Sequence, residues 1–175
     1  TLTRYIEPAS ASASAATAAA APGSRLKALP MDVTSDAQVA AAAEAVQGWT
    51  DLRPSRRRLL CVVNNAGVGT GGYVEWMQMA DFERDCAVNY LGVVRVSKAF
   101  VPQLRRSAQL VAQRAAQRWK RPTASAAAPR MLIVSSMAGK LPSPLLSSYC
   151  ATKHASVAFA ASLRMELGIW GINVC

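Results

Sequence analysis

Residues 59–67 read Leu-Leu-Cys-Val-Val-Asn-Asn-Ala-Gly, an apolar run that ends in two asparagines, an alanine and a glycine. A short apolar run bounded by turn residues is typical of a parallel strand that is buried on both faces. Two further runs have the same character: Met131–Val134, which Ser135 and Ser136 follow, and Ile172–Cys175. The sequence therefore predicts parallel strands, two of which have polar residues at their carboxyl ends.

Helical segments separate these strands. Ser35 is a predicted N-cap for an alanine-rich helix that Gly48 would end. In chain order we predict a strand at 25–31, a helix at 36–47, a strand at 59–63, a helical stretch at 79–106 in one piece or two, a strand at 131–134, a helix at 147–167 and a strand at 172–175. This alternation predicts an α/β fold, a doubly wound, Rossmann-like parallel sheet with right-handed crossovers and helices on both faces. Because such sheets bind ligands at the carboxyl ends of their strands, we expect three polar clusters to lie at that edge: Asp32, residues 64–67, and Ser135 with Ser136.

The charge of the chain raises the question of nucleic-acid binding. The chain has 175 residues, the size of one domain, and a formal net charge of +10 at pH 7. More than half of its 20 basic residues fall in two tracts, at 53–58 and 105–130, and neither tract alternates with aromatic residues suited to base stacking. We therefore expect solvated surface at both tracts and no nucleic-acid partner, with contact to an anionic membrane surface as the alternative.

Composition also bears on metals, compartment and domain organisation. Four scattered cysteines and one histidine, without a CxxC pair, predict no metal site and reduced thiols in an intracellular compartment. No apolar run approaches the length of about 18 residues that predicts a membrane-spanning helix. Low-complexity segments at about 8–23 and 107–129 are predicted inserts, the second of which could instead prolong the helix before it. We interpret residues 1–175 as one partial Rossmann-type dinucleotide-binding and catalytic domain.

Tyr149 and Lys153 lie four residues apart in the sequence Tyr-Cys-Ala-Thr-Lys and would share one face of a helix. A phenol is a poor acid or base near neutrality, and an ammonium held close to it favours the phenolate. The pair therefore predicts a group that donates and accepts a proton. The spacing alone is weak evidence, because such pairs also occur on exposed helix faces.

Other polar residues could join this pair. Ser136 lies thirteen residues before Tyr149, at the end of a strand, where its hydroxyl could polarise a substrate carbonyl oxygen. Asn89 places an amide in an otherwise apolar helical face, and a buried amide needs hydrogen-bond partners. The alternatives are structural: an N-cap or turn for the serines, and a turn for the asparagines at 64–67.

These motifs together resemble a known family. In order and spacing they are similar to the motifs of the short-chain dehydrogenase/reductase family. The matching residues are Asp32-Val33, Asn-Asn-Ala-Gly at 64–67, Asn89, Ser136, Tyr149 and Lys153. The resemblance extends over about 25–175, apart from 107–129, and is strongest for 17β-hydroxysteroid, retinol and 3-hydroxybutyrate dehydrogenases. It implies an NAD- or NADP-dependent oxidoreductase that acts on the alcohol or ketone of a lipophilic molecule such as a steroid or retinoid.

The resemblance implies a role for each motif residue. Tyr149 would be the general acid/base, Lys153 would favour its phenolate and bind the nicotinamide ribose, and Ser136 would orient the substrate. Asn89 would support a water-linked proton relay. The remaining cofactor contacts would be Asp32 and Val33 at the adenine and Asn65, Ala66 and Gly67 along the adenosine.

One motif of the family has no counterpart in the chain. The family's first strand and its TGxxxGxG phosphate-binding loop are missing, and the glycines at 67–72 precede no suitable helix. We therefore expect the fold to be incomplete at both ends, and this chain to bind cofactor weakly with little or no activity. The alternative is a truncated, non-catalytic paralogue that acts at most as a dimer partner.

Cofactor choice, partners and location also follow from the resemblance. Arg4 lies near the end of the family's second strand and weakly favours NADP, whereas the similar oxidative relatives mostly use NAD. A homodimer or homotetramer would form through the helices that carry Asn89 and Tyr149. An intracellular location is implied, with endoplasmic reticulum or mitochondrial association and membrane contact through segments outside this chain. The residues that would either join the dimer surface or belong to the core of one chain are Phe100, Val101 and Leu104.

Overall fold

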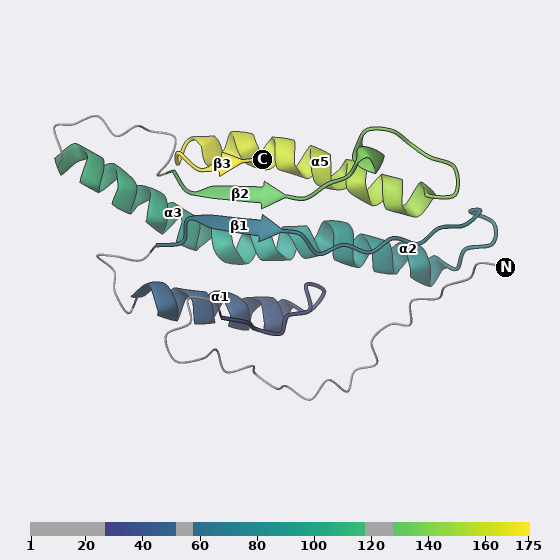
Figure 1. The fold of residues 1–175 in the computed structure, drawn as a ribbon, viewed down its shortest axis with the longest axis horizontal. Helices are drawn as coiled ribbons and strands as arrows, with labels where there is room; N and C mark the ends of the chain where they lie inside the picture. The colour runs from purple at the N-terminus through teal and green to yellow at the C-terminus, as the bar shows by residue number, and fades with distance from the viewer. Residues whose placement is uncertain (1–26, 52–57, 118–127) are drawn as a thin grey trace. The chain divides into compact units, whose positions relative to one another are not determined.

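A sheet of three parallel strands forms the centre of the fold. The computed structural model describes residues 27–51, 58–117 and 128–175. The strands lie in the order β1-β2-β3 (Figure 1), and their bounds are Cys61–Asn64, Arg130–Ile133 and Asn173–Val174. The predicted parallel α/β sheet is therefore confirmed over the strands that the structure describes.

Three helical stretches alternate with these strands. The first is α1 (Asp36–Asp51). The second is continuous and consists of α2 (Met79–Cys86), the π-helix η1 (Ala87–Gly92) and α3 (Val93–Gln117). The third consists of the 3-10 helix η2 (Met137–Gly139) and, after a loop, α5 (Ser147–Gly168). Residues from Asp32 onward form one compact unit, and the described residues 27–31 belong to a separate one.

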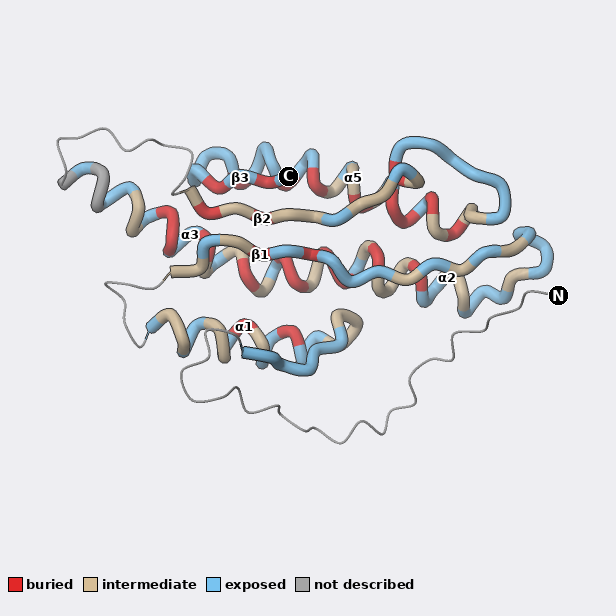
Figure 2. The backbone as a smooth tube through the Cα atoms, in the orientation of Figure 1, coloured by how far each residue is buried: buried red, intermediate tan, exposed pale blue. Residues whose placement is uncertain are grey.

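One hydrophobic core holds the sheet against α3 and α5. The register pairs Val62 with Met131 and Met131 with Val174, so that these three side chains form a buried row on one face of the sheet. Figure 2 shows the buried positions as stripes along the helices. The helical side chains in this core are Val39 and Ala43 from α1, Val96, Phe100, Leu104 and Ala108 from α3, and Ala160, Leu163 and Leu167 from α5, with Val101 packed against them. Phe100 and Leu104 are therefore core residues of one chain.

The other face of the sheet is open. Val63 lies between two buried neighbours in β1 and is 54 % exposed, because its side chain points away from the row that contains Val62. The described helices α1, α3 and α5 share a core with the Val62 face alone. The prediction of helices on both faces is therefore not met within the described residues.

Two further predictions need correction. Residues 27–31 form no strand, since an alternating segment becomes a strand only where a neighbour pairs with it and no described residue does so here. Gly48 does not end α1, which continues to Asp51, because glycine inside a helix costs only about 0.5–1 kcal/mol. For the low-complexity segment that starts at residue 107, the structure favours the alternative of a prolonged helix, since α3 extends to Gln117. The predicted insert at 8–23, Arg4 and residues 118–127 lie outside the described residues.

Candidate active site

Tyr149 and Lys153 lie in the first two turns of α5. Lys153 is 5 % exposed, and its ammonium donates a hydrogen bond of 3.1 Å to the carbonyl oxygen of Val134, directly after β2. The same nitrogen lies 5.6 Å from the centroid of the Tyr149 ring. The ring is half-buried and lies against Gly69, where an added Cβ would be 3.0 Å from Cδ2 of Tyr149. The structure therefore brings the phenol and the ammonium together beside the loop after β1.

Asn89 lies in the π-helix η1 and is 1 % exposed. Its Oδ1 accepts from the Val68 N–H at 2.9 Å, while its Nδ2 donates to the Val68 carbonyl at 2.8 Å and to Oγ1 of Thr152 at 3.0 Å. One amide thus fixes the loop after β1 and connects it to α5. The need of a buried amide for partners is met entirely within the site.

Gly67 lies close to both this amide and the ammonium. A Cβ at residue 67 would lie 3.3 Å from Oδ1 of Asn89 and 3.5 Å from Nζ of Lys153. Gly67 is exposed, as are Asn65 and Ala66 before it, so their backbone is accessible at the end of β1. The absence of a side chain at residue 67 leaves the ammonium room for a ligand.

Ser136 lies at the carboxyl end of β2, and its Oγ accepts from the Ala138 N–H at 3.2 Å. This hydrogen bond caps the N-terminus of η2, which packs against α5. Gly139 at the end of η2 lies very close to α5, because a Cβ on Gly139 would be 2.9 Å from the Lys153 carbonyl oxygen; it would also be 2.7 Å from Oγ of Ser135. Ser136 thus caps a turn, which is the structural alternative predicted from the sequence. The turn packs against α5, the helix that carries Tyr149.

The carboxyl ends of β1 and β2 are level, as the sequence predicts for two of its three polar clusters. The strands pair Asn64 with Ile133, and the Val134 N–H donates to the Asn64 carbonyl at 2.9 Å. The third cluster differs, because Asp32 follows no strand. Val33 nevertheless approaches η1, where an added Cβ on Gly92 would be 2.8 Å from Cγ2 of Val33.

Asp32 is exposed and binds its own turn. Its Oδ1 accepts from both the backbone N–H and the hydroxyl of Thr34, each at 2.8 Å. These hydrogen bonds, with a smaller contribution from the charge of Arg95, hold the pKa of the carboxyl below its usual value. The turn leads into α1, whose predicted N-cap is confirmed, since the Ser35 hydroxyl accepts from the Gln38 N–H at 3.3 Å.

Comparison with known proteins decides the family. The family model described as short chain dehydrogenase matches residues 3–175. This chain belongs to the short-chain dehydrogenase family. The resemblance inferred from the motifs is therefore confirmed, and so is the fold.

The short-chain dehydrogenase relatives are longer than this chain. It is 32 % identical over 150 residues to D-beta-hydroxybutyrate dehydrogenase, mitochondrial, of Rattus norvegicus, with 86 % of this chain and 37 % of the relative covered. It is 35 % identical over 151 residues to 17-beta-hydroxysteroid dehydrogenase type 2 of Homo sapiens, covering 86 % of this chain and 33 % of the relative. The chain thus spans about a third of the length of these relatives.

Solved structures of short-chain dehydrogenases have the same fold. The 3-ketoacyl-(acyl-carrier-protein) reductase from Brucella melitensis, complexed with NADH, superposes with a TM-score of 0.69 at 26 % identity and covers 85 % of this chain and 52 % of that one. A Burkholderia phymatum short-chain dehydrogenase in complex with NAD gives a TM-score of 0.67 at 25 % identity, covering 86 % of this chain and 46 % of that one.

Among the described residues, no helix is both long and apolar enough to cross a bilayer.

The chain also has a buried acidic residue that the motifs do not indicate. Asp85 in α2 is fully buried and accepts hydrogen bonds from Thr70 and from Ser148. Its position four residues before Asn89 is the signal that could have found it, because residues at that spacing share a helix face.

Proposed function

We propose that the protein is an NAD(P)-dependent oxidoreductase that interconverts an alcohol and a ketone on a lipophilic substrate. The observation that carries this proposal is the buried ammonium of Lys153, held by the Val134 carbonyl and 5.6 Å from the centre of the Tyr149 ring. A fixed positive charge beside a phenol is the arrangement expected where that phenol donates and accepts a proton during a reaction.

The exposed backbone beside Lys153 supports a nicotinamide cofactor there. An ammonium carries three N–H donors, and the described residues supply Lys153 with one acceptor, so two donors remain for ribose hydroxyls. The exposed stretch at 65–67 and the missing side chain of Gly67 leave room beside it. The residues present therefore fit the nicotinamide half of the cofactor, whereas within the described ranges none replaces the family's phosphate-binding loop.

The chain's own residues would handle the proton and the orientation of the substrate. The cofactor, when bound, donates or accepts the hydride. Tyr149 protonates the carbonyl oxygen in the reductive direction and accepts the proton in the oxidative one. The Ser136 hydroxyl polarises the same oxygen, and Asn89 holds the loop against which the phenol rests.

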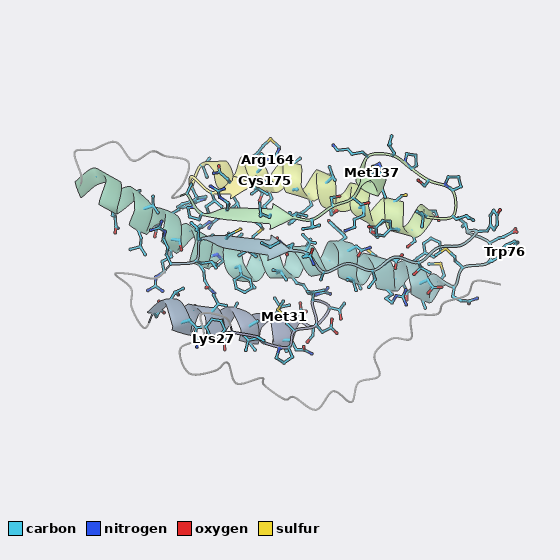
Figure 3. All side chains as sticks on the ribbon, in the orientation of Figure 1. Lys27, Met31, Trp76, Met137, Arg164 and Cys175 are labelled. Carbon is cyan, nitrogen blue, oxygen red and sulfur yellow. The ribbon has the colours of Figure 1, made fainter. Side chains whose placement is uncertain are left out.

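Exposed apolar side chains support a lipophilic substrate. The loop after β1 and the loop after η2 are joined by a hydrogen bond of 2.8 Å from the Gly72 N–H to the Leu145 carbonyl. Trp76 on the first loop is 68 % exposed and Met137 at the start of η2 is 82 % exposed, and Figure 3 shows both on the side toward which β1 and β2 point. Such exposed apolar groups beside a polar site suit an apolar ligand with one reactive oxygen. The other exposed apolar residues of these loops are Tyr73, Val74, Leu141 and Leu145, and Met79 at the start of α2 is exposed as well.

The test uses the complete protein and its Tyr149→Phe variant. Oxidation of steroid alcohols, retinol and 3-hydroxybutyrate is followed by absorbance of the reduced cofactor, with NAD and NADP in parallel. We expect turnover of a steroid or retinoid by the wild type and loss of turnover in the variant. Equal turnover in both proteins would contradict the role of Tyr149, and no turnover of any substrate would favour the non-catalytic paralogue.

We also propose a homodimer that forms through α2, η1 and α5. An apolar cavity of about 350 Å³ supports it, lined on one side by Phe82, Cys86 and Tyr90 and on the other by α5 residues that include Ala151 and Ala155. Small residues on α5 would let a second copy approach closely. Sedimentation of the wild type as a dimer and of Ala151→Arg as a monomer is expected, and a wild-type monomer would refute the proposal. We further propose an intracellular location with mitochondrial or endoplasmic reticulum association, testable by fractionation.

A further inference from the structure

A buried carboxylate connects the two segments that meet at Tyr149. Asp85 has no exposed surface, and a carboxylate without water must be compensated by donors from the protein. Three donors reach it: the Ser148 hydroxyl at 2.9 Å and the Thr70 N–H at 3.2 Å, both on Oδ2, and the Thr70 hydroxyl at 3.1 Å on Oδ1. These donors come from the N-terminus of α5 and from the loop after β1.

A guanidinium completes this cluster from the solvent side. Nη2 of Arg84 lies 3.9 Å from Oδ1 of Asp85 and donates to Oγ1 of Thr70 at 2.7 Å. The Arg84 side chain is 53 % exposed, so its attraction for the carboxylate is screened by water. The three hydrogen bonds, rather than the ion pair, therefore determine where the carboxylate and its partners lie.

The two partners of Asp85 flank the contact between Tyr149 and the loop. Thr70 follows Gly69 directly, Ser148 precedes Tyr149 directly, and Gly69 is the residue against which the Tyr149 ring lies. We propose that Asp85 is a positioning residue, which holds the phenol of Tyr149 in place by tying both sides of this contact to one carboxylate. The proposal rests on the proposed function for its catalytic consequence, but its structural part stands on the hydrogen bonds alone.

Removing the carboxylate should affect the chemical step more than cofactor binding. Asp85→Ala leaves three donors without their acceptor and frees the N-terminus of α5 from the loop. A misplacement of about 1 Å of a reacting group costs about 100-fold in rate. We expect kcat to fall by about 10- to 100-fold, with the KM for the cofactor nearly unchanged, because no cofactor contact proposed above depends on Asp85.

The conservative variant and a matched core variant separate positioning from general loss of stability. In Asp85→Asn the amide oxygen can occupy the place of Oδ2 and accept from Ser148 and from the Thr70 N–H, so kcat should recover to within a few-fold of wild type. Val39→Ala removes two buried methyl groups from the core in α1 and should lower the melting temperature without changing kcat.

A second measurement is independent of activity. The α-protons of Gly69 lie against the Tyr149 ring and should have upfield NMR shifts caused by the ring current. We expect these shifts in wild type, Asp85→Asn, Val39→Ala and Tyr149→Phe, and their loss in Asp85→Ala. An Asp85→Ala protein that keeps both the Gly69 shifts and wild-type kcat would overturn the proposal.

The outcomes distinguish the two proposals. A wild type that turns over no substrate refutes the proposed function, while the Gly69 shifts still decide whether Asp85 positions the ring. If Asp85→Ala fails to fold, Ser148→Ala replaces it, since that variant removes one of the three donors. It should lower kcat by about 3- to 10-fold and reduce the Gly69 shifts, and unchanged values of both would refute the role of Asp85.

Discussion

Gly139→Ala tests whether the turn that begins at Ser136 is held against α5 as tightly as the structure indicates. An added Cβ would lie 2.7 Å from Oγ of Ser135, 2.9 Å from the Lys153 carbonyl oxygen and 3.0 Å from Cγ2 of Val157. The serine side chain can rotate, but the carbonyl belongs to the backbone of α5 and cannot move by itself. The methyl group must therefore push η2 away from the helix.

Overpacking of this kind costs about 1–3 kcal/mol of unfolding free energy. For a chain of this size each kcal/mol lowers the melting temperature by about 2–4 °C, so a decrease of roughly 2–12 °C is expected. Because Ser136 caps η2, the displacement should also move the Ser136 hydroxyl and lower kcat in the complete protein. Thermal unfolding followed by circular dichroism and steady-state kinetics measure the two effects.

Gly48→Ala is the matched control. Gly48 lies inside α1, and an added Cβ there has no neighbour within 4 Å. The substitution should therefore stabilise the protein by about 0.5–1 kcal/mol through helix propensity, with kcat unchanged. If Gly139→Ala is as stable and as active as this control, the packing of η2 on α5 has been described wrongly.

Three more substitutions test the site. Tyr149→Phe should lower the catalytic rate by about 10²–10⁴-fold while cofactor binding, measured by nicotinamide fluorescence, is retained; equal losses of both would contradict a role in proton transfer. Asn89→Ala leaves the N–H and the carbonyl of Val68 without their partner and should cost about 1–3 kcal/mol in urea unfolding, a reading refuted by an unchanged midpoint. The lowered pKa of Asp32 means that its carboxylate stabilises the fold above the unfolded value of about 3.9, a contribution lost as the pH falls through the folded-state pKa. Asp32→Asn should therefore lose less stability than wild type between pH 6 and pH 2, and parallel curves would exclude this contribution.

The sequence predicted the strands β1 and β2 and their polar ends because both signals are local. An apolar run followed directly by asparagines or serines specifies a buried strand and what lies at its end. The pairing of Tyr149 with Lys153 was likewise predictable from a spacing of four on one helix. Longer-range contacts, such as the ring of Tyr149 on Gly69, depend on how two segments approach and have no local signature.

Asp85 was missed for a related reason. In the sequence it is one of several charged residues in the segment 81–85, and an exposed helix face explains such a cluster well. Its spacing of four from Asn89 is the one signal in the sequence, and the packing of α2 against α5 is what shows that this carboxylate is buried and that its neighbour Arg84 is not. The open sheet face that exposes Val63 was missed because residues 59–63 are apolar throughout, which indicates burial on two faces whether or not both are covered.

The π-helix η1 makes this helical stretch tolerant of a change in length. A π-helical turn accommodates one residue more than an α-helical turn, and each residue of an α-helix rotates the next by about 100°. Deleting one residue of Ala87–Gly92 other than Asn89 would therefore restore regular winding while α2 keeps its rotation relative to α3, so that Asp85 still faces Ser148. The same deletion in the middle of α3 would instead turn one end of that helix by about 100° against the other and take part of its apolar face out of the core.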